Sequence, residues 1–204
     1  MMLEALLVAL AWVAALLAQP WRMLRRTPLI TPLLAILVIL PWMWALPRLH
    51  AMPLQLQWSG ACLAVLLLGW PLAIPALTLV ALIAALVAQT PMDSLVAQLA
   101  WQGVVPATLA LGLGALVRRW IGTHPFVYLL GRAFLGTAVC AFTAATLSQW
   151  AGHSLQGIDP GLALVARWLM SWGDAFVTGL VAAVFVAFRP QWLATWSDGL
   201  YLRR

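Results

Sequence analysis

The chain has 204 residues, of which 65% are hydrophobic and 8% are charged, and eleven arginines against five acidic residues give a net charge of +6. Soluble domains carry about 25% charged residues, so this composition excludes an ordinary water-soluble fold and indicates that lipid surrounds most of the chain. No basic stripe with interleaved aromatic residues lies outside the apolar runs, so nucleic acid is not an expected partner.

The first apolar runs have the length of membrane-crossing helices, which need about 20 residues. Residues 3–19 form a slightly short first run, and a basic turn follows it. The second run, residues 28–46, contains Pro32 and Pro41, which predict kinks. A polar loop over residues 47–57 then separates it from the third run.

The next apolar stretch, residues 58–89, is too long for one span, since it would form about 48 Å of ideal helix. We expect it to break at the Gly-Trp-Pro sequence of residues 69–71, giving a short third span over 57–69 and a fourth over 72–89. A break at membrane depth requires surrounding protein or a cavity. This pair of helices therefore indicates a central site.

Three further spans follow, over residues 94–117 with Pro106 inside, residues 125–150, and residues 161–188. The sixth span has small residues at helical spacing, which predicts close packing against a neighbour. The pattern as a whole predicts an all-α fold, a polytopic transmembrane helical bundle with about seven spans.

Arginines are distributed unevenly among the expected loops. With the N-terminus outside, seven spans place most of them on the cytoplasmic side: Arg22, Arg25, Arg26, Arg118, Arg119, Arg189, Arg203 and Arg204. Arg48 alone is left on the outer side, and this asymmetry is the positive-inside pattern. We therefore expect an outside N-terminus, one transmembrane domain over residues 1–188, and a cytoplasmic amphipathic tail over residues 189–204.

Three charged residues lie inside the last two predicted spans, where charges are expensive and usually face a bundle interior or a partner. Asp174 lies about halfway along the last span, Arg167 shares its helical face about 10 Å away along the axis, and Arg132 enters the sixth span from its cytoplasmic end. They predict either a polar cluster that binds a ligand or couples to a partner, or a structural Arg–Asp pair that fixes helix register. The sequence leaves open which arginine would pair with Asp174.

Candidate metal ligands gather in the segments expected outside the membrane. Thioether and imidazole groups suit transition metals, and the candidates are Met1, Met2, His50 and Gln57. The competing interpretation is that the histidines at span edges are ordinary interfacial residues.

Signatures of catalysis or of a disulfide framework are absent from the sequence. Cys62 and Cys140 each lie in an apolar run and are expected to be small buried residues. Ser171 has no histidine in its span to accept a proton. An enzyme is therefore not expected.

The C-terminal segment resembles a known family. Residues 176–179 (FVTG) and 188–195 (FRPQWLAT) are similar to a proteobacterial branch of the energy-coupling factor permeases, relatives of the CbiM/NikM cobalt and nickel uptake components. Residues 60–71 (GACLAVLLLGWP), 103–106 (GVVP) and 125–128 (PFVY) match further segments in the expected order. The resemblance covers about residues 59–202.

The resemblance implies a substrate-capture permease of a bacterial inner-membrane importer. Cobalt or nickel would be its substrate, and its partners would be a transmembrane coupling subunit and cytoplasmic ATPases, since the chain has no P-loop of its own. Asp174 falls where this branch has an acidic residue, whereas Arg132 falls where it has asparagine.

Metal-transporting relatives bind the metal through the N-terminal amine, a histidine at position two, and a histidine before the third span's glycine. Met2 and Gln57 stand at the two histidine positions here. The alternative function is therefore a membrane sensor or assembly scaffold that keeps the fold but binds no metal.

Overall fold

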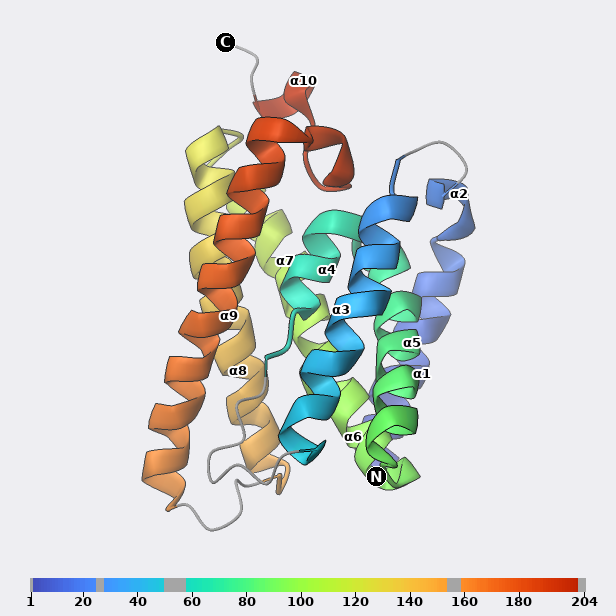
Figure 1. Cartoon of the computed structure of the whole chain (residues 1–204). Helices are drawn as coiled ribbons and strands as arrows, with labels where there is room; N and C mark the ends of the chain where they lie inside the picture. The colour runs from blue at the N-terminus through green and yellow to red at the C-terminus, as the bar shows by residue number, and fades with distance from the viewer. Residues whose placement is uncertain (1, 25–27, 50–57, 154–158, 202–204) are drawn as a thin grey trace.

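The computed structural model describes residues 2–24, 28–49, 58–153 and 159–201, and every regular element in these segments is a helix (Figure 1). Within them, 5 helices are long and apolar enough to cross a membrane. These are α3 (Ile30–Leu49), α5 (Trp70–Ala88), the continuous helices Met92–Trp120 and Val127–Trp150, and α9 (Pro160–Phe188). The predicted all-α transmembrane bundle is confirmed.

Two further apolar helices complete the bundle but are shorter than a bilayer. Helix α1 (Met2–Leu17) has 16 residues and α4 (Ala61–Leu68) has 8, whereas the hydrocarbon core is about 30 Å thick and needs about 20 residues. The count of about seven is thus approximate. The predicted third span over 57–69 needs correction, because α4 is long enough to cross only part of a bilayer.

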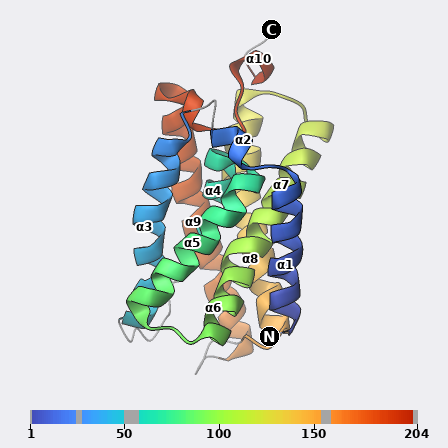
Figure 2. The same ribbon diagram turned by 90° about the vertical axis from the view of Figure 1, so that its right-hand side faces the viewer.

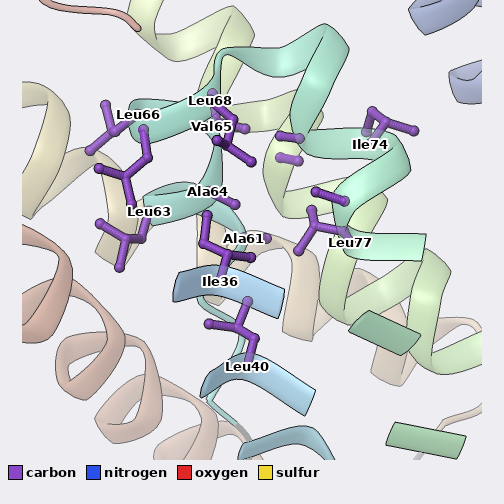
Figure 3. Packing of buried hydrophobic residues seen from close by; sticks show 14 of the residues in the cluster. Ile36, Leu40, Ala61, Leu63, Ala64, Val65, Leu66, Leu68, Ile74 and Leu77 are labelled. Carbon is purple, nitrogen blue, oxygen red and sulfur yellow. The ribbon is translucent and has the colours of Figure 1, made fainter. Parts of the chain in front are cut away.

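Helix α4 lies in the centre of the bundle, and all of its residues are buried. Its sequence, ACLAVLLL, is apolar on every side, as a helix surrounded by other helices requires. Figure 3 shows Ile36 and Leu40 of α3 and Ile74 and Leu77 of α5 packed around it. The two views in Figures 1 and 2 place α4 between α3, α5 and the helices that follow.

Glycines with left-handed backbone angles bound α4 at both ends. Gly60 has φ +62° and Gly69 has φ +75°, values that L side chains rarely adopt. The predicted break at residues 69–71 is confirmed at Gly69. It lies beside Met23 and Ala194, at the end of the bundle that carries α2 (Trp21–Leu24) and the C-terminal segment, and not at the depth expected for a central site.

Prolines are accommodated without ending their helices. Pro32 lies in the first turn of α3, and that helix continues through Pro41 and Pro47. The helix Met92–Trp120 comprises α6 (Met92–Gln98), a π-helical segment η1 (Leu99–Val104) and α7 (Val105–Trp120). Another π segment, η2 (Val127–Leu135), precedes α8 (Gly136–Trp150).

The C-terminal segment folds back over one end of the bundle through η3 (Pro190–Trp192) and α10 (Asp198–Tyr201). The amides of Ala194 and Thr195 donate hydrogen bonds to the carbonyls of Leu67 (3.0 Å) and Leu66 (3.3 Å). These carbonyls end α4 and have no partner within their own helix. The predicted amphipathic tail therefore caps the central helix, with Leu193, Trp196 and Tyr201 buried.

The two ends of the bundle differ in charge. Figure 1 shows the N- and C-termini at opposite ends. Arg22, Arg118, Arg119 and Arg189 belong to segments at the α10 end. The N-terminal end carries most of the acidic residues and two of the described arginines: Glu4, Asp93, Asp159, Arg48 and Arg167. This distribution follows the predicted positive-inside pattern, and the membrane orientation itself stays a prediction.

Candidate functional site

A non-helical stretch, residues 58–60, enters the interior of the bundle and leads into α4. The amide of Gly60 donates a hydrogen bond to the Asp174 carboxylate over 3.4 Å. Asp174 lies near the middle of α9 and is 2% exposed. Because the N-terminal end of a helix has free N–H groups and partial positive charge, a carboxylate is the complementary group there.

Other donors point to the same carboxylate. The amide of Ser59, the indole of Trp58 and the hydroxyl of Thr178 all interact with Asp174. Trp58 Nε1 and Thr178 Oγ1 are both buried. Neither meets the geometry of a hydrogen bond, with Asp174 or with any other described group. The site is therefore rich in donors around a single buried acceptor.

Side chains from two other helices satisfy the carbonyls of this stretch. Gln102 Nε2 donates to the Trp58 carbonyl (2.9 Å), and Trp44 Nε1 donates to the Ser59 carbonyl (2.9 Å). Backbone groups in the membrane interior need such partners, since water is absent. We call Trp44, Trp58, Ser59, Gly60, Gln102 and Asp174 the central network.

Pro106 explains one bond of the central network. The carbonyl of Gln102 would accept the N–H of residue 106 in a regular α-helix, but proline has no N–H. The Ser59 hydroxyl donates to this carbonyl instead, over 2.6 Å. A proline inside the fifth predicted span thus creates the acceptor that anchors the non-helical stretch.

A second polar cluster lies toward the N-terminal end of the bundle, and we call it the N-terminal cluster. His153 Nε2 contacts Glu4 Oε1 at 2.9 Å, and Trp101 Nε1 donates to the same oxygen over 3.5 Å. Arg167 Nη2 donates to the carbonyl of His153 over 2.8 Å. Glu4 is 4% exposed. The contacts of this cluster join α1 to η1, to the loop after α8, and to α9.

The charged residues predicted as one cluster lie at three separate levels. Asp174 belongs to the central network, Arg167 to the N-terminal cluster, and Arg132 to a hollow at the α10 end beside Gly114. His153 contacts Glu4, and in the described segments neither arginine forms a salt bridge with Asp174. Arg167 is two turns from Asp174, about 10 Å along the axis, and its guanidinium instead binds a carbonyl of the preceding loop.

Most of the candidate metal ligands fall outside the described residues: Met1, His50 and Gln57. Met2 begins α1 and is 90% exposed. Among the residues that the structure describes, no three His, Cys, Asp or Glu side chains come together to hold a metal ion.

Cys62 and Cys140 are buried free thiols, as predicted, but they are also neighbours. The two side chains interact across the contact between α4 and α8. Cys62 Sγ also lies 3.8 Å from the carbonyl of Pro106. Sequence reasoning missed this pairing, because the two cysteines lie in different spans.

No family model matches this chain. Likewise, no curated protein and no solved structure matches it. The resemblance to the permease family therefore depends on its sequence motifs alone.

Those motifs meet at α4. The segment GACLAVLLLGWP contains α4 itself, GVVP contains Pro106, FVTG contains Thr178, and FRPQWLAT contains Thr195. Pro106 frees the carbonyl that Ser59 binds, Thr178 interacts with Asp174, and Thr195 caps Leu66. Four segments that are distant in sequence thus contribute to holding one buried helix.

Sequence reasoning also missed Glu4 and Gln102 as site residues. Glu4 is the single acidic residue of the first apolar run, and an isolated charge in a span is a usable signal. Gln102 offered a weaker signal, since it lies four residues before a proline inside a predicted helix.

Proposed function

We propose that this protein is the substrate-binding permease component of an importer of the energy-coupling-factor type, with a transition metal ion such as cobalt or nickel as its substrate class. The observation that carries the proposal is the start of α4, a half-length helix, inside the bundle beside Asp174. Membrane transporters typically place their binding sites at discontinuous helices near the membrane midplane. Non-helical backbone is tolerated there only against protein or a cavity.

The chemistry of the central network suits a small polar or ionic solute. Asp174 offers a carboxylate from α9. The thiol of Cys62 lies on α4, and the thiol of Cys140 lies on the neighbouring helix α8. Thiolate ligands suit soft and borderline transition metals. In the sequence, the candidate ligand Gln57 directly precedes residues 58–60, and the candidate His50 lies eight residues before Trp58.

The protein would need partners to import its substrate. Since its sequence contains no P-loop, ATP hydrolysis would come from cytoplasmic ATPases through a transmembrane coupling subunit in the bacterial inner membrane. The positive-inside pattern would place α10 and the C-terminal segment on the side of those ATPases.

Affinity purification in mild detergent tests this proposal. The chain, tagged at its N-terminus and produced in its native host, should co-purify with a P-loop ATPase and a second membrane subunit, both identified by mass spectrometry. A control membrane protein with the same tag should recover neither. Repeated purification of the intact chain without either partner would contradict the importer.

A second candidate function is a membrane sensor or assembly scaffold that binds no metal. The observation that favours it is that both buried carboxylates already have internal partners, Asp174 with Gly60 and Glu4 with His153. Introducing histidine at both family positions, Met2→His with Gln57→His, separates the candidates. A metal site should gain cobalt or nickel affinity, whereas a repurposed scaffold should not.

A further inference from the structure

The α10 end of the bundle contains a small hollow between α7 and η2. Its lining includes Gly114, Arg118, Gly122, Tyr128, Arg132 and Tyr201. Figure 1 shows α10, which supplies Tyr201, at this end of the molecule. The hollow is separate from the central network and from the N-terminal cluster, and neither the resemblance nor the proposed importer assigns it a role.

Arg132 is fitted into this hollow by a glycine. A Cβ atom at position 114 would lie 2.6 Å from Arg132 Nε, so a larger residue there would force the guanidinium to move from its present place against α7. The guanidinium lies 5.8 Å from the centre of the Tyr128 ring. Its Nε is buried and has no acceptor among the described groups, although a guanidinium offers five N–H donors.

Among the described residues, no carboxylate lines the hollow. Arg118 lines it together with Arg132, and neither forms an ion pair with any carboxylate in the described segments. The acidic residue at this end is Asp198, and its Oδ1 accepts a hydrogen bond from Trp196 Nε1 over 2.6 Å. Two guanidinium groups facing one hollow without an anion repel each other, and a bound anion would relieve that repulsion.

The surroundings of the hollow indicate which anion fits. Exposed apolar side chains lie next to the lining residues in the chain, where acyl chains would cover them: Leu116, Trp120, Ile121, Phe126 and Leu130. Trp120 is 78% exposed, as is typical of an indole at the membrane interface. Guanidinium groups bind phosphate oxygens in a paired geometry that suits this position.

We propose that Arg132 and Arg118 bind the phosphate group of an anionic phospholipid at the opening of this hollow. The acyl chains lie along the exposed faces of α7 and η2. Tyr128 and Tyr201 enclose the headgroup from the side of the C-terminal segment. The site therefore couples the anionic leaflet to the segment that caps α4.

Lipid binding by the purified full-length chain tests the proposal. Native mass spectrometry in neutral detergent with added phosphatidylglycerol should show one retained lipid, and phosphatidylcholine should not replace it. Loss of a charge-assisted contact should weaken retention about tenfold in Arg132→Gln and in Arg118→Gln. Arg119→Gln is the matched control, because Arg119 is an adjacent exposed arginine that does not line the hollow.

A parallel arm uses inorganic phosphate alone and measures the thermal shift of the same variants. A shift with phosphate but no retained lipid, again lost in Arg132→Gln and Arg118→Gln, would assign the same phosphate chemistry to a dissolved anion. If Arg132→Gln fails to fold, Arg118→Gln decides, since that side chain is exposed. Binding of neither ligand, or equal losses in all three variants, would overturn the proposal.

Discussion

The amide of Gly60 donates a hydrogen bond to Asp174, 114 residues later in the chain, over 3.4 Å. This bond fixes the N-terminal end of α4 to the middle of α9. At the other end of α4, the carbonyls of Leu66 and Leu67 accept hydrogen bonds from Thr195 and Ala194. A helix of 8 residues is too short to be stable alone, so it depends on burial and on these remote caps.

Removing the carboxylate of Asp174 should loosen this arrangement. Asp174→Ala leaves the donors of residues 58–60 without an acceptor and should cost about 1–3 kcal/mol of stability. Asp174→Asn keeps one acceptor oxygen and should cost less. Thermal unfolding in detergent measures both, with Asp93→Asn as an exposed acidic control. If Asp174→Ala were as stable as the wild type, the hydrogen bond between Gly60 and Asp174 would make no contribution to stability.

Gly60 should resist substitution because of its backbone angle. Alanine at φ +62° is strained, which costs about 1–2 kcal/mol, and its Cβ would lie 3.2 Å from the Leu40 side chain. Gly112→Ala is the control, because that helical position has open space around it and should gain about 0.5–1 kcal/mol. Similar stabilities of the two variants would argue against a left-handed residue at position 60.

The contact between Cys62 and Cys140 gives a direct test of how α4 packs. Iodine, which enters membranes, should take two electrons from the two thiols and form an intramolecular disulfide, releasing two protons and two iodides. Peptide mass spectrometry should then find a cross-link between the two segments. Cys62→Ser and Cys140→Ser should both abolish it. A link that forms only after denaturation would place the thiols apart in the fold.

Thr195 should matter more than its place near the C-terminus suggests. Its hydroxyl donates to the Leu66 carbonyl over 3.0 Å and lies 2.9 Å from the Tyr128 hydroxyl. Thr195→Val should cost about 1 kcal/mol and speed hydrogen exchange in the last turn of α4. Ser197→Ala changes an exposed hydroxyl nearby and should leave both unchanged. Equal exchange in the two variants would show that the cap is dispensable.

The helices could be predicted from the sequence because length and hydropathy decide where a chain remains in lipid. The break at Gly69 was predictable because glycine and proline punctuate a run too long for one span. The depth of α4 within the bundle could not be predicted from the sequence. A polar segment followed by an apolar run, such as residues 50–68, is compatible with a full span and with a half-length helix. The contact of Gly60 with Asp174 of α9 places the start of the helix inside the bundle.

Partners of the charged residues were the hardest part to predict. Helical spacing placed Arg167 and Asp174 on one face, but the guanidinium binds the carbonyl of His153, which belongs to the preceding loop. Glu4 meets His153 across 149 residues of sequence, a separation that no local pattern encodes. Similarly, the aromatic residues after Pro190 suit a membrane interface as well as a buried cap.

Metal titration of the purified protein tests the importer proposal at its substrate. Cobalt, nickel, copper and zinc would be titrated into wild type, Asp174→Asn, Gln57→Ala and the control Asp93→Asn, with bound metal measured by elemental analysis. We expect one transition metal ion per chain, bound more weakly in Asp174→Asn and in Gln57→Ala but unchanged in the control. A folded wild-type protein that binds none of the four metals would contradict the metal importer and favour the scaffold.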